Sequence, residues 1–186
     1  MWRFIFLISV LPIIAAIVAR WYFGLRVLRA EGKRPCTADA IRWEVYLGKN
    51  PPVETNQAPA QEFGKLLRLQ ALADWKSRDK KRAASRESAK KFGLAVPPLS
   101  LVIAVFALLV AKVPFMGALA ILFASTALSA AFGLLTLGAE LRAIAVTTRR
   151  LRESRAFVRR DDEDAVASCA VAHAWAESIP PILRIL

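Results

Sequence analysis

A long, almost uncharged segment constrains this sequence more than any other feature. Between Gly93 and Ala139 the only charged side chain is Lys112, which separates two apolar runs. A helix of roughly 20 residues crosses the ~30 Å hydrocarbon core of a bilayer, so each run is long enough to cross once. A helical hairpin inside a soluble core is the alternative, but a soluble domain would interrupt runs of this length with charges. The segment therefore predicts two antiparallel membrane helices with a turn over residues 112–117.

A third apolar stretch lies at the N-terminus. Residues 4–19 have no charge and follow a short basic start, which fits either a secretory signal peptide or a membrane helix. Against cleavage, Ile14 and Ile17 occupy positions where a cleavage site needs small side chains. Residues 20–22, Arg-Trp-Tyr, are typical of an interfacial anchor. We therefore predict an uncleaved helix over residues 2–24, bent at Pro12.

The charge distribution predicts the topology. The chain has 186 residues, 56% hydrophobic, with a formal net charge of +12. Between Arg20 and Gly93 there are 17 Lys and Arg against 8 Asp and Glu. Because Lys and Arg near membrane ends stay cytoplasmic, this region and the C-terminal tail are expected inside and the N-terminus outside. The sequence thus predicts an all-α, multi-pass plasma (inner) membrane protein with three transmembrane helices plus cytoplasmic helices. Its two cysteines fit a reducing compartment.

Four segments follow from these patterns: a first span (1–24), a cytoplasmic basic region (25–92), the hairpin (93–139) and cytoplasmic C-terminal helices (140–186). In the basic region, Thr37 is a candidate N-cap for a helix that Gly48 and the following Pro51-Pro52 end. An amphipathic helix is expected over 59–74. Residues 76–91 are strongly basic, which fits a solvated helix beside lipid headgroups or a site for anionic lipid. Nucleic acid is not favoured there, because no aromatic residue is interleaved.

The tail and the third span predict helix packing. The third span is rich in Ala, Ser and Gly, which let a neighbouring helix approach closely, either within the chain or in another subunit. After Glu140 the chain becomes amphipathic, and residues 161–164 place four acids at the start of an alanine-rich helix over 165–178. The apolar face after Glu140 is expected to contain Leu141, Ile144, Thr148, Leu151 and Val158.

One short motif points to chemistry. A zinc peptidase helix needs H-E-x-x-H, in which two imidazoles four residues apart hold the metal and the Glu activates water. In this chain Gln61 and Lys65 stand at the two histidine positions around Glu62. An ammonium has no lone pair, so Lys65 cannot ligate a metal.

The layout around this motif resembles the membrane-anchored neutral zinc metallopeptidases of the YugP-like group. Their pattern is an N-terminal span, a helix bearing A-H-E-V-G-H, a basic stretch, a membrane hairpin and a tail beginning L-P-V-E-F-D-A-S. Here the motif helix reads Ala-Gln-Glu-Phe-Gly-Lys, and Leu-Gly-Ala-Glu-Leu-Arg-Ala follows the third span over residues 137–143. The resemblance implies that Glu62 matches the general base and Glu140 the third metal ligand.

With both histidines replaced, the resemblance implies a degenerate, non-catalytic member with no cofactor and a scaffolding or regulatory role, whose partner is another membrane protein or a second copy. A working peptidase would require zinc bound by substitute ligands such as Cys36, or Cys169 and His173, which are four residues apart. Lys65 is expected to sit in the former metal position, paired with Glu62 and Glu140. On that basis Lys65→Met destabilises the protein, and Lys65→His with Gln61→His restores metal affinity.

Overall fold

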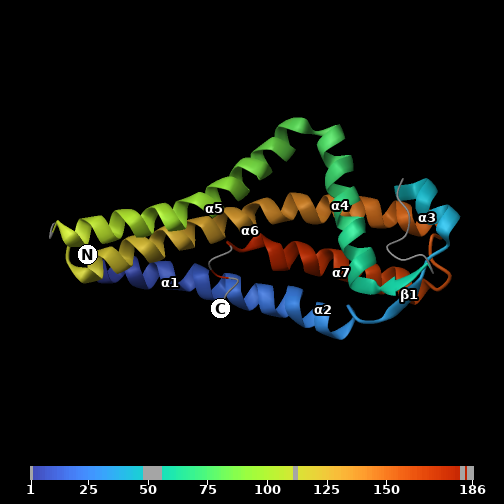
Figure 1. Ribbon diagram of the computed structural model, residues 1–186, viewed down its shortest axis with the longest axis horizontal. Helices are drawn as coiled ribbons and strands as arrows, with labels where there is room; N and C mark the ends of the chain where they lie inside the picture. The colour runs from blue at the N-terminus through green and yellow to red at the C-terminus, as the bar shows by residue number, and fades with distance from the viewer. Residues whose placement is uncertain (1, 48–55, 111–112, 181–182, 184–186) are drawn as a thin grey trace. The chain divides into compact units, whose positions relative to one another are not determined.

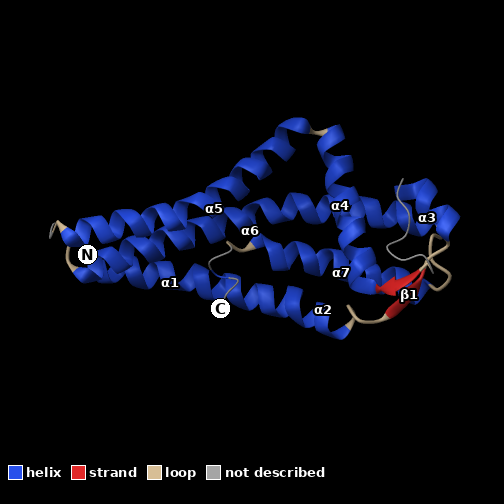
Figure 2. Ribbon diagram, viewed as in Figure 1, coloured by secondary structure: helices blue, strands red, loops and turns tan. Residues whose placement is uncertain are grey.

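The computed structural model describes residues 2–47, 56–110, 113–180 and 183, and it is almost entirely helical, as predicted (Figures 1 and 2). An N-terminal helix α1 (Trp2–Ala19) continues through a π-helical turn η1 (Arg20–Leu25) into α2 (Arg26–Ala30). The other helices are α3 (Ala40–Leu47), α4 (Ala60–Arg78), α5 (Lys80–Leu109), α6 (Phe115–Ser154) and α7 (Arg160–Ser178). Two short strands, β1 (Pro35–Thr37) and β2 (Gln57–Pro59), pair antiparallel, with Cys36 opposite Ala58.

The chain divides into two compact units. The first, here called the span unit, comprises Met1–Arg20, Ala84–Leu137 and Glu177–Leu186. The second, the polar unit, comprises Trp21–Ala83 and Gly138–Ala176. Three helical stretches in the described part of the chain are long and apolar enough to cross a membrane, namely Trp2–Ala30, Lys80–Leu109 and Phe115–Ser154. The predicted all-α class with three transmembrane helices is thereby confirmed.

The span unit exposes large apolar side chains on its outer faces. On α1, for example, Phe4, Leu7, Ile8 and Leu11 are each between 63% and 73% exposed. Water would disfavour a continuous surface of this kind, whereas lipid tails solvate it. The exposed apolar faces therefore fit a protein embedded in a membrane.

The small side chains of the third span pack within the chain. On α6, Ala127 and Ala130 belong to one buried cluster with Ile13 of α1. On another part of the same helix, the Ser125 hydroxyl lies 2.6 Å from that of Ser100 on α5. Hydrogen bonds of this kind satisfy polar groups in a bilayer, where no water is available. The intramolecular interpretation of the small-residue stretch is thus correct within the span unit.

Two helices run on past the changes in polarity that separate the predicted segments. The basic residues 80–91 form the first turns of α5 rather than a separate helix, and α6 continues unbroken beyond Glu140 to Ser154. Phe115 already begins α6, so residues 115–117 lie in the helix rather than in the predicted turn, while Lys112 lies outside the described residues. Backbone hydrogen bonds propagate a helix whatever its side chains prefer, and nothing in these stretches interrupts them.

The capping and tail predictions also need correction. Thr37 lies in β1, and the helix cap is Asp39, whose Oδ1 accepts hydrogen bonds from the amides of Ile41 and Arg42 at 3.1 and 3.3 Å. Val158 lies beyond the end of α6 and is 73% exposed, so it is not on the predicted apolar face. The predicted helix end at residues 48–52 lies outside the described residues. The acids at 161–163 do occupy the first turn of α7, as expected.

Candidate functional site

The polar unit holds the Gln-Glu-x-x-Lys motif of residues 61–65 on α4. The buried residues of this helix recur every three or four positions, so they share one face. They are Ala60, Phe63, Gly64, Leu67, Arg68 and Ala71. Glu62 and Lys65, the two charged residues of the motif, fall on the other side and are exposed. Helical periodicity therefore turns the motif's charges toward solvent and turns Arg68 inward.

The start of α4 is fixed by the chain that leaves α2. The Ala60 amide donates a hydrogen bond to the Arg34 carbonyl at 2.9 Å, and the Gln61 amide donates to the Gly32 carbonyl at 3.1 Å. These bonds satisfy amides that a helix N-terminus leaves without intrahelical partners. They also hold Gln61 against the turn after α2.

Three aromatic rings pack against one another in the polar unit. The ring of Trp43 on α3 lies 4.8 Å from that of Phe63 on α4, and both rings contact Phe157, at 5.5 and 5.2 Å respectively. All three pairs meet edge to face, the arrangement that aromatic quadrupoles favour. This cluster anchors α4 to α3 and to the segment before α7.

A buried ion pair occupies the centre of the candidate site. The Nε of Arg68 donates to Oε1 of Glu140 at 2.6 Å, and the two side chains are only 4% and 5% exposed. The charge that meets Glu140 is thus one helical turn further along α4 than Lys65. The prediction that Lys65 pairs with Glu140 is wrong, and both substitution results expected from it lose their basis. Arg68 lies at helical spacing from the buried apolar residues of α4. This spacing was the sequence signal for the burial of its side chain.

The residues present do not fit a zinc ion. A guanidinium holds the carboxylate that the metallopeptidase resemblance assigns to the metal, and a cation cannot ligate a second cation. His173 lies with Nε2 3.1 Å from the carbonyl oxygen of Gln61, and so contacts backbone. Within the described residues, no group of three or more His, Cys, Asp or Glu side chains is arranged to hold a metal.

The two cysteines are buried and unoxidised in the polar unit. Burial raises the pKa of the Cys36 thiol from 9.0 to about 11, and the nearby Asp162 carboxylate adds to this. Burial also raises the pKa of the Cys169 thiol to about 11, with a smaller contribution from Cys36. The thiolate is the form that attacks electrophiles and binds metals. Both cysteines are therefore held in their unreactive form.

Thiol labelling of the native protein is expected to be slow. A pKa two units above 9.0 leaves about 100-fold less thiolate at pH 8, and burial slows access further. The rate of reaction with a chromogenic disulfide reagent should therefore be at least about 100-fold below that of a free cysteine. Denatured protein should react quickly with two equivalents, which serves as the control. Fast labelling of the native protein would contradict the burial of both thiols.

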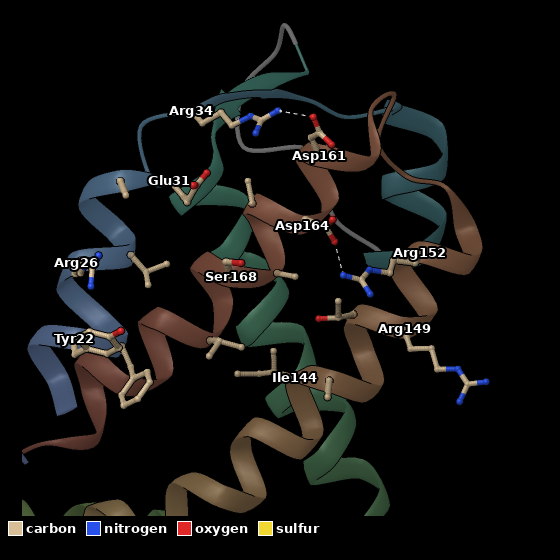
Figure 3. A pocket seen from close by; sticks show the side chains of 18 residues that line it. Tyr22, Arg26, Glu31, Arg34, Ile144, Arg149, Arg152, Asp161, Asp164 and Ser168 are labelled. Atoms are coloured by element: carbon tan, nitrogen blue, oxygen red, sulfur yellow. Dashed lines mark hydrogen bonds and ion pairs between the residues drawn. The ribbon is translucent and has the colours of Figure 1, made fainter.

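An open groove of about 1060 Å³ lies elsewhere in the polar unit (Figure 3). One wall is formed by η1, α2 and the residues after α2, the other wall by α6, and α7 also lines it. Arg34 pairs with Asp162 at 3.3 Å, and Arg152 pairs with Asp164 at the same end of the groove. Nothing in the sequence marked this groove, because its lining residues come from three separate segments.

No protein-family model matches the sequence, and neither a curated protein nor a solved structure shows significant similarity to it. The resemblance to zinc metallopeptidases accordingly stays a prediction.

Proposed function

We propose that this chain is a non-catalytic integral membrane protein, similar in layout to the neutral zinc metallopeptidases, that acts as a scaffold or regulator of another membrane protein or of a second copy of itself. The buried ion pair between Arg68 and Glu140 is the observation that best supports this proposal. A site in which an arginine neutralises the carboxylate needs no metal to balance its charge. The pair fixes α4 to α6 and serves as a structural element.

The arrangement of the remaining motif residues also supports a non-catalytic role. A general base must lie within hydrogen-bond reach of the water it activates, next to the metal. Glu62 is exposed on the face of α4 opposite Arg68, so it is turned away from Glu140. The competing proposal, a peptidase with zinc on Cys36 or on Cys169 and His173, needs thiolate ligands, whereas both thiols have raised pKa values.

For the orientation, we propose a plasma-membrane protein with its N-terminus outside and the polar unit in the cytoplasm. The polar unit contains most of the basic residues that follow the first span and precede the second, and such residues stay on the cytoplasmic side. Four exposed lysines in the first half of α5 suit anionic headgroups near that surface, namely Lys80, Lys81, Lys90 and Lys91. Binding of anionic lipid by this segment stays a prediction.

Metal analysis tests the proposed function. The full-length protein, purified without chelator from cells grown with added zinc, is expected to contain well under one zinc per chain. Chelator should leave its melting temperature unchanged, because a structural zinc site would lose folding free energy when the metal is removed. Stoichiometric zinc together with proteolysis that Glu62→Gln abolishes would overturn the proposal. A Glu44→Gln variant, changed at an exposed position on α3, is the matched control.

A further inference from the structure

The groove in the polar unit has an ordered lining that the proposed function does not use. Its walls continue directly in the chain from apolar spans: Tyr22 follows α1 by three residues, and Ile144 follows the apolar run that ends at Ala139. Tyr22 and Ile144 lie at the same end of the groove, and Arg34 and Asp161 lie at the opposite end (Figure 3). The groove therefore has an apolar end next to the spans in sequence and a charged end away from them.

The charges along the groove are also ordered. Toward the apolar end, the guanidinium of Arg26 lies 5.2 Å from the centre of the Tyr22 ring. Glu31 follows five residues later on the same wall, and the acids Asp161 and Asp164 of α7 also line the groove. A ligand that entered from the apolar end would meet Arg26 first, then Glu31, and beyond them the ion pairs of Arg34 and Arg152 with the acids of α7.

Most of the charged residues that line the groove form ion pairs within the described part of the protein, but Arg26 and Glu31 do not. Arg34 pairs with Asp161 and Asp162, Arg152 pairs with Asp164, and Arg149 pairs with Glu153 and points away from the groove in Figure 3. Among the described residues, no ion pair involves Arg26 or Glu31. A cation and an anion that form no ion pair, spaced along one wall, fit a zwitterion.

We propose that this groove binds the headgroup of a phosphatidylethanolamine, a phospholipid with one phosphate and one primary ammonium. The phosphate binds Arg26, and the ammonium beyond it donates hydrogen bonds to Glu31. The glycerol and the first acyl carbons pack on Tyr22 and Ile144 at the apolar end. In a phospholipid the amine is attached beyond the phosphate, so its charges follow the same order as those of the wall. This inference stands independently of the metallopeptidase resemblance.

Other lipids match the groove less well. A phosphatidylglycerol offers the phosphate but no ammonium, so Glu31 would face a neutral glycerol in place of a cation. A phosphatidylcholine has a quaternary ammonium, which cannot donate a hydrogen bond to Glu31. Charge-assisted hydrogen bonds are roughly twice as strong as neutral ones, so the loss of this contact should be measurable.

Native mass spectrometry of the full-length protein, released from nanodiscs, tests the proposal. Three lipids with identical acyl chains, phosphatidylethanolamine, phosphatidylcholine and phosphatidylglycerol, are supplied in equal amounts. Phosphatidylethanolamine is expected to be retained about tenfold more than either competitor, the effect of one hydrogen bond to a charged group. Equal retention of the three lipids, or a co-purified peptide in place of lipid, would overturn the proposal.

Single substitutions test the phosphate-binding residue and the ammonium-binding residue separately. Glu31→Gln should remove the preference for phosphatidylethanolamine. Arg26→Gln should lower the retention of all three lipids by the same factor, because all three contain the phosphate. Glu44→Gln, which changes a carboxylate outside the groove, should behave as wild type. Ser168→Leu, at an exposed groove position on α7, should block retention by filling the space even if Glu31→Gln were unstable. An unchanged lipid preference in Glu31→Gln, or undiminished retention in Ser168→Leu, would contradict the assigned site.

Discussion

Replacing Arg68 by Met is expected to destabilise the protein by about 3–5 kcal/mol, which is the usual cost of leaving one member of a buried ion pair without its partner. The Glu140 carboxylate would lose the guanidinium that lies 2.6 Å away and would remain in a site that is almost closed to solvent. A drop in melting temperature, or in the denaturant midpoint measured in detergent, would report the loss.

Two further variants isolate the charge effect. Arg68→Met with Glu140→Leu removes both charges and should recover most of the lost stability, because a well-packed apolar pair often replaces a buried ion pair without penalty. Lys65→Met is the matched single control on the exposed face of α4 and should stay within about 0.5 kcal/mol of wild type. If Arg68→Met and Lys65→Met proved equally mild, the pair would not be the structural element proposed here.

Replacing Gly64 by Leu is expected to cost about 3 kcal/mol or more, the upper part of the range for overpacked sites. A Cβ at this position would lie 2.7 Å from Cβ of Cys169 and 2.9 Å from the backbone nitrogen of Ala170. Backbone atoms of α7 cannot rotate away, so α4 and α7 would have to separate. Because this contact lies beside the buried thiols, the variant should also label faster at Cys169.

Gly138→Leu provides the matched control. Nothing lies within 4 Å of a Cβ placed at Gly138, so the substitution meets open space in the middle of α6. Leucine favours a helix over glycine by up to about 1 kcal/mol, so this variant should be neutral or slightly more stable than wild type. Equal destabilisation by the two substitutions would show that the α4–α7 contact is not what requires Gly64.

Apolar length and charge distribution made the membrane class predictable from the sequence alone. Runs of about 20 apolar residues have few stable locations other than a bilayer, whatever the tertiary structure. The helix α4 was also predictable: an amphipathic helix was expected over residues 59–74, and α4 covers Ala60–Arg78. The small side chains of the third span predicted close packing, but did not choose between α1, α5 and another subunit.

Helix ends were the least predictable elements. The sequence changes from basic to apolar near Gly93 and from apolar to amphipathic near Glu140, yet α5 and α6 pass both points without a break. The polarity of a segment indicates whether its side chains lie in water or in lipid. A helix, in contrast, ends only where its backbone hydrogen bonding stops. The choice of Asp39 rather than Thr37 as a cap was likewise decided by β1, whose pairing with β2 holds Thr37 in a strand.

By itself, the sequence determined that this chain spans a membrane three times with helices, because that property depends on the local composition of each segment. Only the tertiary structure decided which cation meets Glu140, since Lys65 and Arg68 both belong to α4 and differ only in which of its faces is buried. The groove likewise exists only because three distant segments meet around it. Charges separated by a hundred residues acquire an order along a surface only after folding, and no local pattern encodes that order.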